Sequence, residues 1–249
     1  MTRRLTVLGL ALVLWACGGQ GTGSLPAETS ITVFAAASLQ PALDKIGARL
    51  RTTDNIKTTF NYAGTQTLVA QLQQGAQGDV FASADTAHMT ALQDAGMISG
   101  PAKIFAHNKL EIAVAKGNPK HIQTLADLSR AGLVVVLADP SVPAGKYAQQ
   151  ALAKAKVTVH PASLELQVTA VLNKVALGEA DAGIVYVSDV VTNGKVDGVA
   201  IPDEQNVIAD YPIAALKSAS NATGARAFID SVLSSDGQAT LKNAGFQGV

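Results

Sequence analysis

The stretch ITVFAAAS (Ile31–Ser38) is an apolar run that ends in small residues. Such a run is typical of a strand in a parallel sheet that is buried on both faces. It is followed by apolar residues at the spacing of one helical face, namely Leu39, Leu43, Ile46 and Leu50. The stretch therefore predicts a buried strand that leads directly into a helix, with Ser38 at the corner as the residue that caps the helix.

The same strand-then-helix pattern occurs twice more along the next part of the chain. KTTFNYAG (57–64) precedes a helix that is expected to start near Thr65, and DVFAS (79–83) precedes a helix capped by Asp85. Three successive units of this kind predict an α/β fold built on a doubly wound sheet with right-handed crossovers.

A second set of elements begins near Asn108. The expected strands are LEIAVA (110–115), LVVVLAD (133–139), AGIVYV (182–187) and YPIAALK (211–217). Helical spacing is found in a short helix over 124–129, in two helices near residues 147–155 and 168–175, and in a late helix over 222–233. About 220 residues are enough for two lobes or for one large domain.

The first thirty residues have the features of an export signal. Arg3 and Arg4 precede an apolar run from Leu5 to Ala16, which is too short to cross a bilayer of about 30 Å. Cys17, the only cysteine of the chain, follows this run directly. We expect a lipoprotein signal peptide over residues 1–17 with acylation at Cys17, and a flexible tether over 18–30. An ordinary signal peptide with an incidental cysteine is the alternative.

Composition and motifs argue against several classes of function. The formal net charge is zero and no basic stripe exists, so nucleic acid is not an expected partner. The chain lacks the GxSxG, HExxH, GxxxxGK[ST] and GxGxxG signatures, and its four histidines lie singly. Asp79 and Asp85 are interpreted as capping or structural carboxylates rather than as an acid–base pair. We therefore expect a protein that catalyses nothing.

Small or hydroxyl-bearing residues stand at several of the expected strand-to-helix corners: Ser38, Thr65, Ser83 and Ala144. Ligands of open α/β sheets bind beyond the carboxyl ends of strands, where helix N-termini present unpaired N–H groups. The corners are thus a candidate anion site. Ordinary helix capping would produce the same pattern, and these residues alone leave both interpretations open.

Four segments together resemble the periplasmic molybdate-binding proteins of ABC importers: AAASL (Ala35–Leu39), GDVFASAD (Gly78–Asp85), DPSVPAGKYA (Asp139–Ala148) and ADAGIVYVSD (Ala180–Asp189). The resemblance implies a two-lobed, type II-like periplasmic-binding-protein fold of the α/β class. Each lobe would be a sheet flanked by helices, and a hinge would join them. Lobe I would comprise 31–106 and 211–249, and lobe II 107–210.

The same resemblance implies a ligand site made of neutral donors from both lobes. The matching positions are Ser38, Thr65, Ala144, Val168 and Tyr186, which would contact a molybdate or tungstate metal centre only through its oxygens. Gln66 stands where the family has a further serine, so its role is open. The arginines that follow the tether lie outside all four segments, which favours recognition by dipoles over salt bridges.

The resemblance also implies partners and location. We expect an exported monomer, held at the cell membrane by its lipid only, that needs no cofactor and delivers a small oxyanion to an ABC transporter permease. The alternatives are a receptor for another oxyanion such as sulfate, an exported α/β hydrolase for which no nucleophile–base pair is found, and a surface adhesin.

Overall fold

The computed structural model describes residues 29–249. The expected signal peptide (1–17), its acylation site Cys17 and the tether as far as residue 28 lie outside the described residues. Within 29–249, no helix has the length and the apolar content that a membrane crossing needs. The elements are, in chain order, β1 (Thr29–Ala36), η1 (Ala37–Leu39), α1 (Gln40–Asp54), β2 (Ile56–Ala63), α2 (Thr65–Gln73), β3 (Val80–Ala82), α3 (Thr86–Asp94), β4 (Ile98–Ala115), η2 (Leu125–Ser129), β5 (Val135–Ala138), α4 (Pro143–Ala155), β6 (Ser163–Glu165), α5 (Val168–Ala176), β7 (Ala182–Tyr186), α6 (Val187–Asn193), β8 (Val196–Ala200), β9 (Ile208–Leu216), α7 (Ala222–Leu233) and α8 (Ser235–Asn243).

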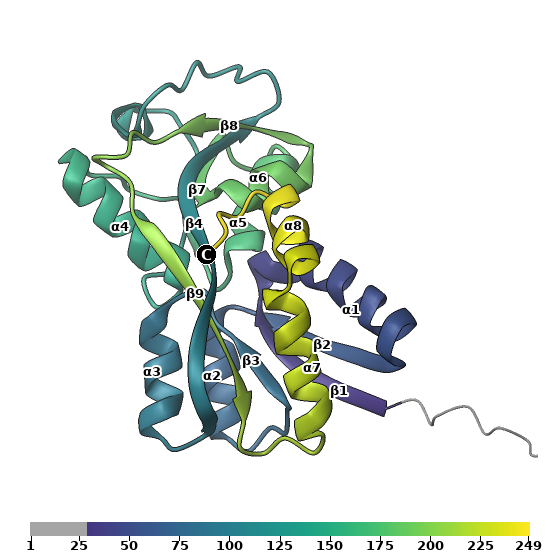
Figure 1. The fold of residues 1–249 in the computed structure, drawn as a ribbon. Coiled ribbons are helices and arrows are strands. Elements are labelled where there is room, and N and C mark those ends of the chain that lie inside the picture. Colours follow the sequence, from purple (N-terminus) through teal and green to yellow (C-terminus); the bar gives the residue numbers. More distant parts are fainter. Residues whose placement is uncertain (1–28) are drawn as a thin grey trace, which may run out of the picture.

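The strands form one nine-stranded sheet, in which the long strands β9 and β4 lie between the strands of the two lobes (Figure 1). The order is β2-β1-β3-β9-β4-β7-β5-β6, and β8 pairs with β4 outside this path. β1 runs parallel to β2 and β3, and β5 runs parallel to β6 and β7, whereas β9 is antiparallel to both of its neighbours. The predicted fold of two α/β lobes joined by crossing strands is confirmed.

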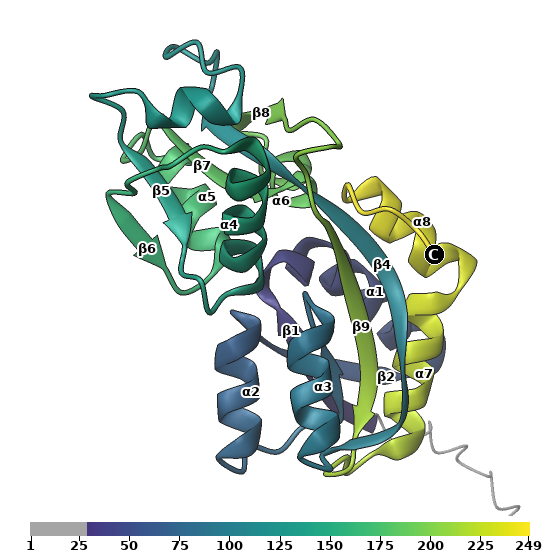
Figure 2. The same cartoon turned by 90° about the vertical axis from the view of Figure 1, so that its left-hand side faces the viewer.

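Side-chain alternation along β1 explains the two layers of helices in lobe I. Ile31 and Val33 face one core with α1 and α7, whereas Phe34 faces a second core with α2 and α3. Figures 1 and 2 show these helix pairs on opposite faces of the sheet. A strand buried on both faces needs a near-continuous apolar sequence, and ITVFAAA provides it.

Lobe II is built on two fully buried strands. All residues of β5 and β7 are buried, and α4 and α5 pack against both of them. The core of lobe II is continuous with the core beneath α1 and α7 of lobe I, because one cluster of buried side chains contains both Ile31 and Val135. The lobes are therefore not packed independently.

The crossing strand β4 is much longer than the strand LEIAVA that the sequence predicted. Gly100 and Pro101 are residues that normally interrupt a strand, and the structure accommodates them in an irregular stretch between the pairs of Ser99 and Lys103. Gly100 has a φ of +75°, which favours glycine, and proline is tolerated at such bulges because no ladder donor is needed there. The predicted lobe boundaries face each other in the paired part of β4 and β9, where Ala106 pairs with Tyr211.

Two elements near the end of lobe II were not predicted. The sequence placed residues 182–187 in one strand, but β7 ends at Tyr186 and Val187 begins α6. β8, which follows α6, is one of the partners of β4. Because α6 starts at the strand end, Tyr186 occupies a strand-to-helix corner.

The last residues of the chain return to the crossing strands. Gln247 and His107 exchange two backbone hydrogen bonds of 2.8 and 2.9 Å. Gly245 lies so close to Ser188 and Val191 of α6 that a side chain there would touch both. The end of the chain thus connects α8 of lobe I with α6 of lobe II.

Candidate binding site between the lobes

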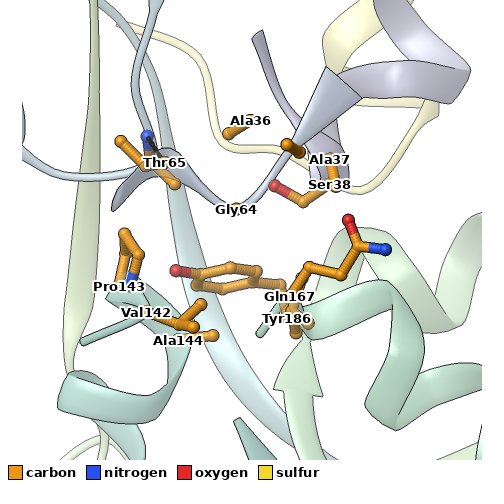
Figure 3. A pocket seen from close by; sticks show the side chains of 13 residues that line it. Ala36, Ala37, Ser38, Gly64, Thr65, Val142, Pro143, Ala144, Gln167 and Tyr186 are labelled. Atoms are coloured by element: carbon orange, nitrogen blue, oxygen red, sulfur yellow. Dashed lines mark hydrogen bonds between the residues drawn. The ribbon is translucent and has the colours of Figure 1, made fainter. Parts of the chain in front are cut away.

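A small cavity lies where the two lobes meet, with about 230 Å³ of empty space. This volume includes space that is open to solvent, so the enclosed part of the cavity is smaller. Figure 3 shows lobe I contributing Ala37, Ser38, Gly64 and Thr65 from one side, with residues of lobe II opposite. The lining residues are Ala36, Ala37, Ser38, Ala63, Gly64, Thr65, Ala84, Val142, Pro143, Ala144, Gln167, Val168 and Tyr186.

The structure brings all five predicted site residues to this cavity. Ser38, Thr65, Ala144, Val168 and Tyr186 come from five different corners and line the same space. Ser83, the remaining small corner residue, does not line it, because its hydroxyl donates to the carbonyl of Asp85 and accepts from the Asp85 N–H. Gln66 does not line it either.

The hydroxyl groups of Ser38 and Thr65 are buried beside the cavity. Ser38 Oγ lies 3.1 Å from the hydroxyl of Tyr211, and Thr65 Oγ1 accepts a hydrogen bond of 3.3 Å from the Ala84 N–H. The prediction that Ser38 caps the following helix is wrong, because the cap positions of η1 and α1 are Ala36 and Leu39 and neither makes a side-chain cap bond. When Tyr211 donates to Ser38, both hydroxyl protons are free for a guest.

The helices that begin at the cavity lack side-chain caps. α2, α4 and α5 have Gly64, Val142 and Gln167 at their N-cap positions, and none of these side chains accepts a bond from the first turn. Ala144 and Val168 belong to the first turns of α4 and α5, where backbone N–H groups have no partner within the helix.

Three other helices of the described chain have side-chain caps, whereas α1 has Leu39 at its N-cap position and no such bond. Asp85 accepts from the N–H of His88 in α3, Asn221 accepts from Gly224 in α7, and Ser234 accepts from Gly237 in α8. The contrast between the two groups of helices is what an anion site requires, because a capped N–H cannot also bind a ligand.

Close packing fixes the start of α4 against the end of β5. At Gly145, a Cβ atom would overlap the carbonyl oxygens of Ala138 and Asp139. Only glycine allows this approach, so the first turn of α4 lies directly beyond the strand end. Pro143 occupies the first helical position, where its missing N–H costs no bond.

Tyr186 ends β7 and is 1% exposed. Its phenol oxygen has no hydrogen-bond partner among the described residues. The ring of Tyr211 contacts it edge-on, with the centroids 5.8 Å apart. Burial raises the pKa of Tyr186 well above its ordinary value, and electrostatic repulsion that would arise between ionised phenols of Tyr186, Tyr211 and Tyr147 raises it further. The phenol therefore keeps its proton and is available as a donor.

The sequence is similar to a family of bacterial proteins and to several of its members. Residues 31–247 match the family model of the bacterial extracellular solute-binding proteins. The chain belongs to this family. This solute-binding protein is 44% identical to the molybdate-binding protein ModA of Mycobacterium tuberculosis over 240 residues, which cover 94% of this chain and 92% of that protein. It is 32% identical to ModA of Escherichia coli, over 90% of this chain and 91% of that protein.

A solved structure of similar fold is the sulfate-binding protein SubI of Mycobacterium tuberculosis. Its TM-score is 0.81 at 19% identity, and the match covers 89% of this chain and 87% of that one. At this identity the likeness shows the fold alone. The resemblance to the molybdate-binding proteins, which was inferred from four short segments, is confirmed by the family match and the ModA relatives.

The carboxylates singled out in the sequence have structural roles in this solute-binding protein. Asp79 accepts bonds from the N–H groups of Thr32 and Asn221, and so connects β1 to the start of α7. Asp85 caps α3 and also contacts the His88 ring. The interpretation of both as structural carboxylates is confirmed.

Sequence reasoning missed several lining residues. Gly64, Val142 and Gln167 line the cavity as N-cap residues, and Gln167 lies opposite Ser38 (Figure 3). The signal that would have found them is three helix starts without Ser, Thr, Asp or Asn at the cap. None of the 13 lining residues carries a formal charge, so every donor that the cavity offers is neutral.

A buried carboxyl lies just outside the lining. Asp189, in the first turn of α6, is 3% exposed and accepts a hydrogen bond of 3.0 Å from the Tyr186 N–H. Burial raises the pKa of Asp189 to about 7, and the bond from the Tyr186 N–H only partly opposes this rise. The site therefore has a titratable neighbour even though its own lining does not titrate near neutral pH.

Proposed function

We propose that this protein captures molybdate, and tungstate with it, between its two lobes. The observation that carries the proposal is the convergence of uncapped helix starts with the unpartnered phenol of Tyr186. Ser38, Thr65, Ala144, Val168 and Tyr186 are the proposed ligand contacts. The names of the ModA relatives support molybdate as the guest.

The chemistry of the lining favours a fully ionised oxyanion. A dianion that leaves water loses a large solvation energy unless each oxygen finds new donors. N–H and O–H groups together with helix dipoles replace that shell, and a hydrogen bond to a charged group contributes about 1.5–3 kcal/mol. Phosphate keeps a proton near neutral pH and needs an acceptor for it, and the lining side chains offer only uncharged amide and hydroxyl oxygens and no carboxylate. Sulfate, which is also a fully ionised dianion, is then distinguished from molybdate only by the size of the ion relative to the cavity.

The two-lobed architecture suggests how the oxyanion is delivered to a transporter. We propose that lobe I (31–106 and 211–249) and lobe II (107–210) rotate relative to each other about β4 and β9. A guest that contacts both lobes then shifts the population toward the closed form. The closed monomer then docks on an ABC transporter permease and releases the oxyanion there. The proposal includes neither a resident cofactor nor a catalysed reaction.

Attachment to the membrane is a separate proposal. Acylation of Cys17 would hold the exported protein at the cell membrane. Mass spectrometry of the N-terminal peptide tests it directly: a lipid-modified Cys17 supports the anchor, and a free N-terminus at another residue contradicts it. Replacement of Cys17 by serine is the matched control and is expected to release the protein.

Calorimetric titration of the purified protein tests the ligand. Molybdate and tungstate are expected to bind with similar affinity, sulfate at least about tenfold more weakly, and phosphate not at all. Sulfate binding tighter than molybdate would make the protein a sulfate receptor, in line with the fold shared with SubI. No binding of any of the four ions would overturn the proposal.

A further inference from the structure

The two lobes also touch at a point outside the cavity. Gln66, in the first turn of α2, donates from its Nε2 to the backbone carbonyl of Leu166, and the distance is 2.8 Å. The two residues are 100 positions apart in the chain. One belongs to lobe I, and the other lies in lobe II between β6 and α5. This contact therefore joins the lobes directly, away from the crossing strands.

A glycine makes the approach possible. A Cβ atom at Gly64 would overlap the Leu166 carbonyl oxygen and would also press on the amide of Gln66. The backbone at Gly64 has φ −58° and ψ 139°, which any residue adopts. Glycine is thus needed here for space and not for conformation. Gly64 and Gln66 together form a socket for one carbonyl of the opposite lobe.

The contact is adjacent in sequence to the cavity on both sides. Gln66 follows Thr65, and Leu166 precedes Gln167, and both of these neighbours line the cavity. The side chain of Leu166 is 67% exposed, so its carbonyl and not its side chain makes the contact. Opening of the lobes must break this bond before the cavity can exchange its guest.

Only one end of the Gln66 amide has a hydrogen-bond partner across the lobes. Its Oε1 is buried and has no hydrogen-bond partner among the described residues, while its Nε2 faces the Leu166 carbonyl. The reversed amide would place two oxygens against each other, so the donor orientation is the favourable one. A buried amide oxygen without a partner costs free energy. This cost disfavours any role in which Gln66 only fills space.

We propose that Gly64, Gln66 and the Leu166 carbonyl form a latch that holds the lobes closed whether or not the cavity is filled. Its effect on oxyanion release rests on the proposed function, but its effect on lobe closure does not. A contact present only in the closed form raises the closed population, slows release and increases apparent affinity, because affinity scales with the fraction of the binding-competent state. Gln66 is a positioning residue and does not touch the guest.

Two measurements test the latch. The first is the release of labelled molybdate during a chase with unlabelled molybdate. The second is the distance between the lobes in the ligand-free protein, measured by electron resonance between spin labels on cysteines introduced at the exposed positions Gln74 and Glu179 in a Cys17→Ser background. The variants are Gln66→Ala and the near-isosteric Gln66→Met, and the matched control is Gln73→Ala at the exposed end of the same helix.

Loss of the single latch bond is expected to accelerate release by about 3- to 10-fold in both Gln66 variants. The ligand-free distance distribution should shift toward the longer, open distances, whereas Gln73→Ala should match the parent protein in both measurements. Gln66 variants that match Gln73→Ala in both readouts would overturn the latch.

Gly64→Ala gives a second, independent variant. Because the backbone there accepts alanine, the chain is expected to fold, while the added methyl group prevents full closure. The inter-lobe distance should stay long even with molybdate present. A parent protein that binds no oxyanion would remove the proposed function, yet the ligand-free distances would still decide the latch.

Discussion

At the scale of single residues, the hydroxyl groups of the cavity differ in what their oxygens already accept. Ser38 Oγ lies beside the Tyr211 hydroxyl, and Thr65 Oγ1 accepts the Ala84 N–H. The Thr65 oxygen is therefore occupied by a donor, and the Ser38 oxygen is occupied when Tyr211 donates to it, which leaves the hydroxyl proton free in each case. Tyr186 has no such neighbour in hydrogen-bond geometry among the described residues. The three hydroxyl groups can therefore turn protons toward a guest, and the Tyr186 oxygen, which accepts no bond within the described chain, keeps its lone pairs free as well.

Tyr186→Phe tests the unpartnered phenol. Removal of one donor to a charged guest is expected to weaken molybdate binding by about 1–3 kcal/mol. The same change removes a buried polar atom without a partner, so the empty protein should be at least as stable as before. Calorimetric titration and thermal unfolding measure the two effects.

Tyr62→Phe is the matched control for this pair of measurements. The Tyr62 phenol donates to Asp44 at 2.9 Å, outside the cavity. Its loss should leave affinity unchanged and lower stability slightly. If Tyr186→Phe behaved like Tyr62→Phe, the phenol of Tyr186 would not belong to the site.

Asp189 makes stability depend on pH. Burial raises its pKa to about 7 in the folded chain, whereas the pKa of an aspartate in an unfolded chain is about 3.9. The folded state then binds more protons between these values, so this contribution to stability is greatest below the unfolded pKa and is lost as pH rises through about 7.

Asp189→Asn is expected to flatten this dependence, since asparagine does not titrate and its oxygen still accepts from the Tyr186 N–H. The unfolding free energy of the parent should fall relative to the variant by on the order of 3 kcal/mol between pH 4 and pH 8. Chemical denaturation across this range measures the difference. A constant difference between parent and variant would contradict the raised pKa.

At the scale of elements, six of the helix starts in the described chain form two contrasting groups. α3, α7 and α8 are capped by their own side chains, and α2, α4 and α5, which begin at the cavity, are not. An uncapped first turn costs stability, and a bound anion can recover it. A bound anion would thus accept hydrogen bonds from the first-turn N–H groups of α2, α4 and α5, as the side-chain caps do at α3, α7 and α8.

Gln167→Asp tests this division. Gln167 has the extended backbone of a cap residue, with φ −157° and ψ 147°, so aspartate there should cap α5 and stabilise the empty protein by about 1 kcal/mol. The carboxylate also repels a dianion, and molybdate binding should weaken by at least about 2 kcal/mol. Thermal unfolding and titration report the two changes.

The neutral variant Gln167→Ser separates capping from charge. It should gain similar stability and lose less affinity than Gln167→Asp. Asn221→Ala, which removes the cap of α7, should lose stability and keep its affinity. Unaltered binding in Gln167→Asp would show that the start of α5 does not face the guest.

The sequence predicted these elements unevenly, for physical reasons. ITVFAAAS predicted β1 well, because a strand buried on both faces must be apolar along its length. β4 was predicted at a third of its length, from Leu110 onward, and its first part contains Gly100 and Pro101, which a strand accommodates only at a bulge. Short strands such as β8 carry too few residues for a clear period.

The site was predictable only in part. The corner residues alone left capping and binding open, and the resemblance to molybdate-binding proteins selected the five residues that the fold brings together. The role of Gln66 was beyond reach, because its partner is a backbone carbonyl 100 residues away. A carbonyl leaves no trace in the side-chain pattern, so only the folded arrangement reveals it.

At the scale of the whole molecule, one core continues from lobe I into lobe II. Side chains of β1 and α1 belong to the same buried cluster as those of β5 and α5. Two lobes with separate cores often unfold in separate steps, whereas a shared core favours a single cooperative transition.

Calorimetric melting is therefore expected to show one transition for the empty protein. Molybdate should move that transition to higher temperature, because a ligand that binds only the folded chain stabilises it by about 4 kcal/mol at a thousandfold excess over its dissociation constant. Phosphate at equal concentration is the control and should leave the midpoint in place. Two resolved transitions, or a shift with phosphate alone, would contradict this expectation.

The return of the chain end to the crossing strands has a practical consequence. Gln247 is bonded to His107 of β4, Gly245 packs on α6, and the final residue Val249 is 65% exposed. If the lobes rotate about β4 and β9 as proposed, a fluorophore attached at Val249 will lie close to the crossing strands and report their movement, which makes this position suitable for the reporter of a biosensor.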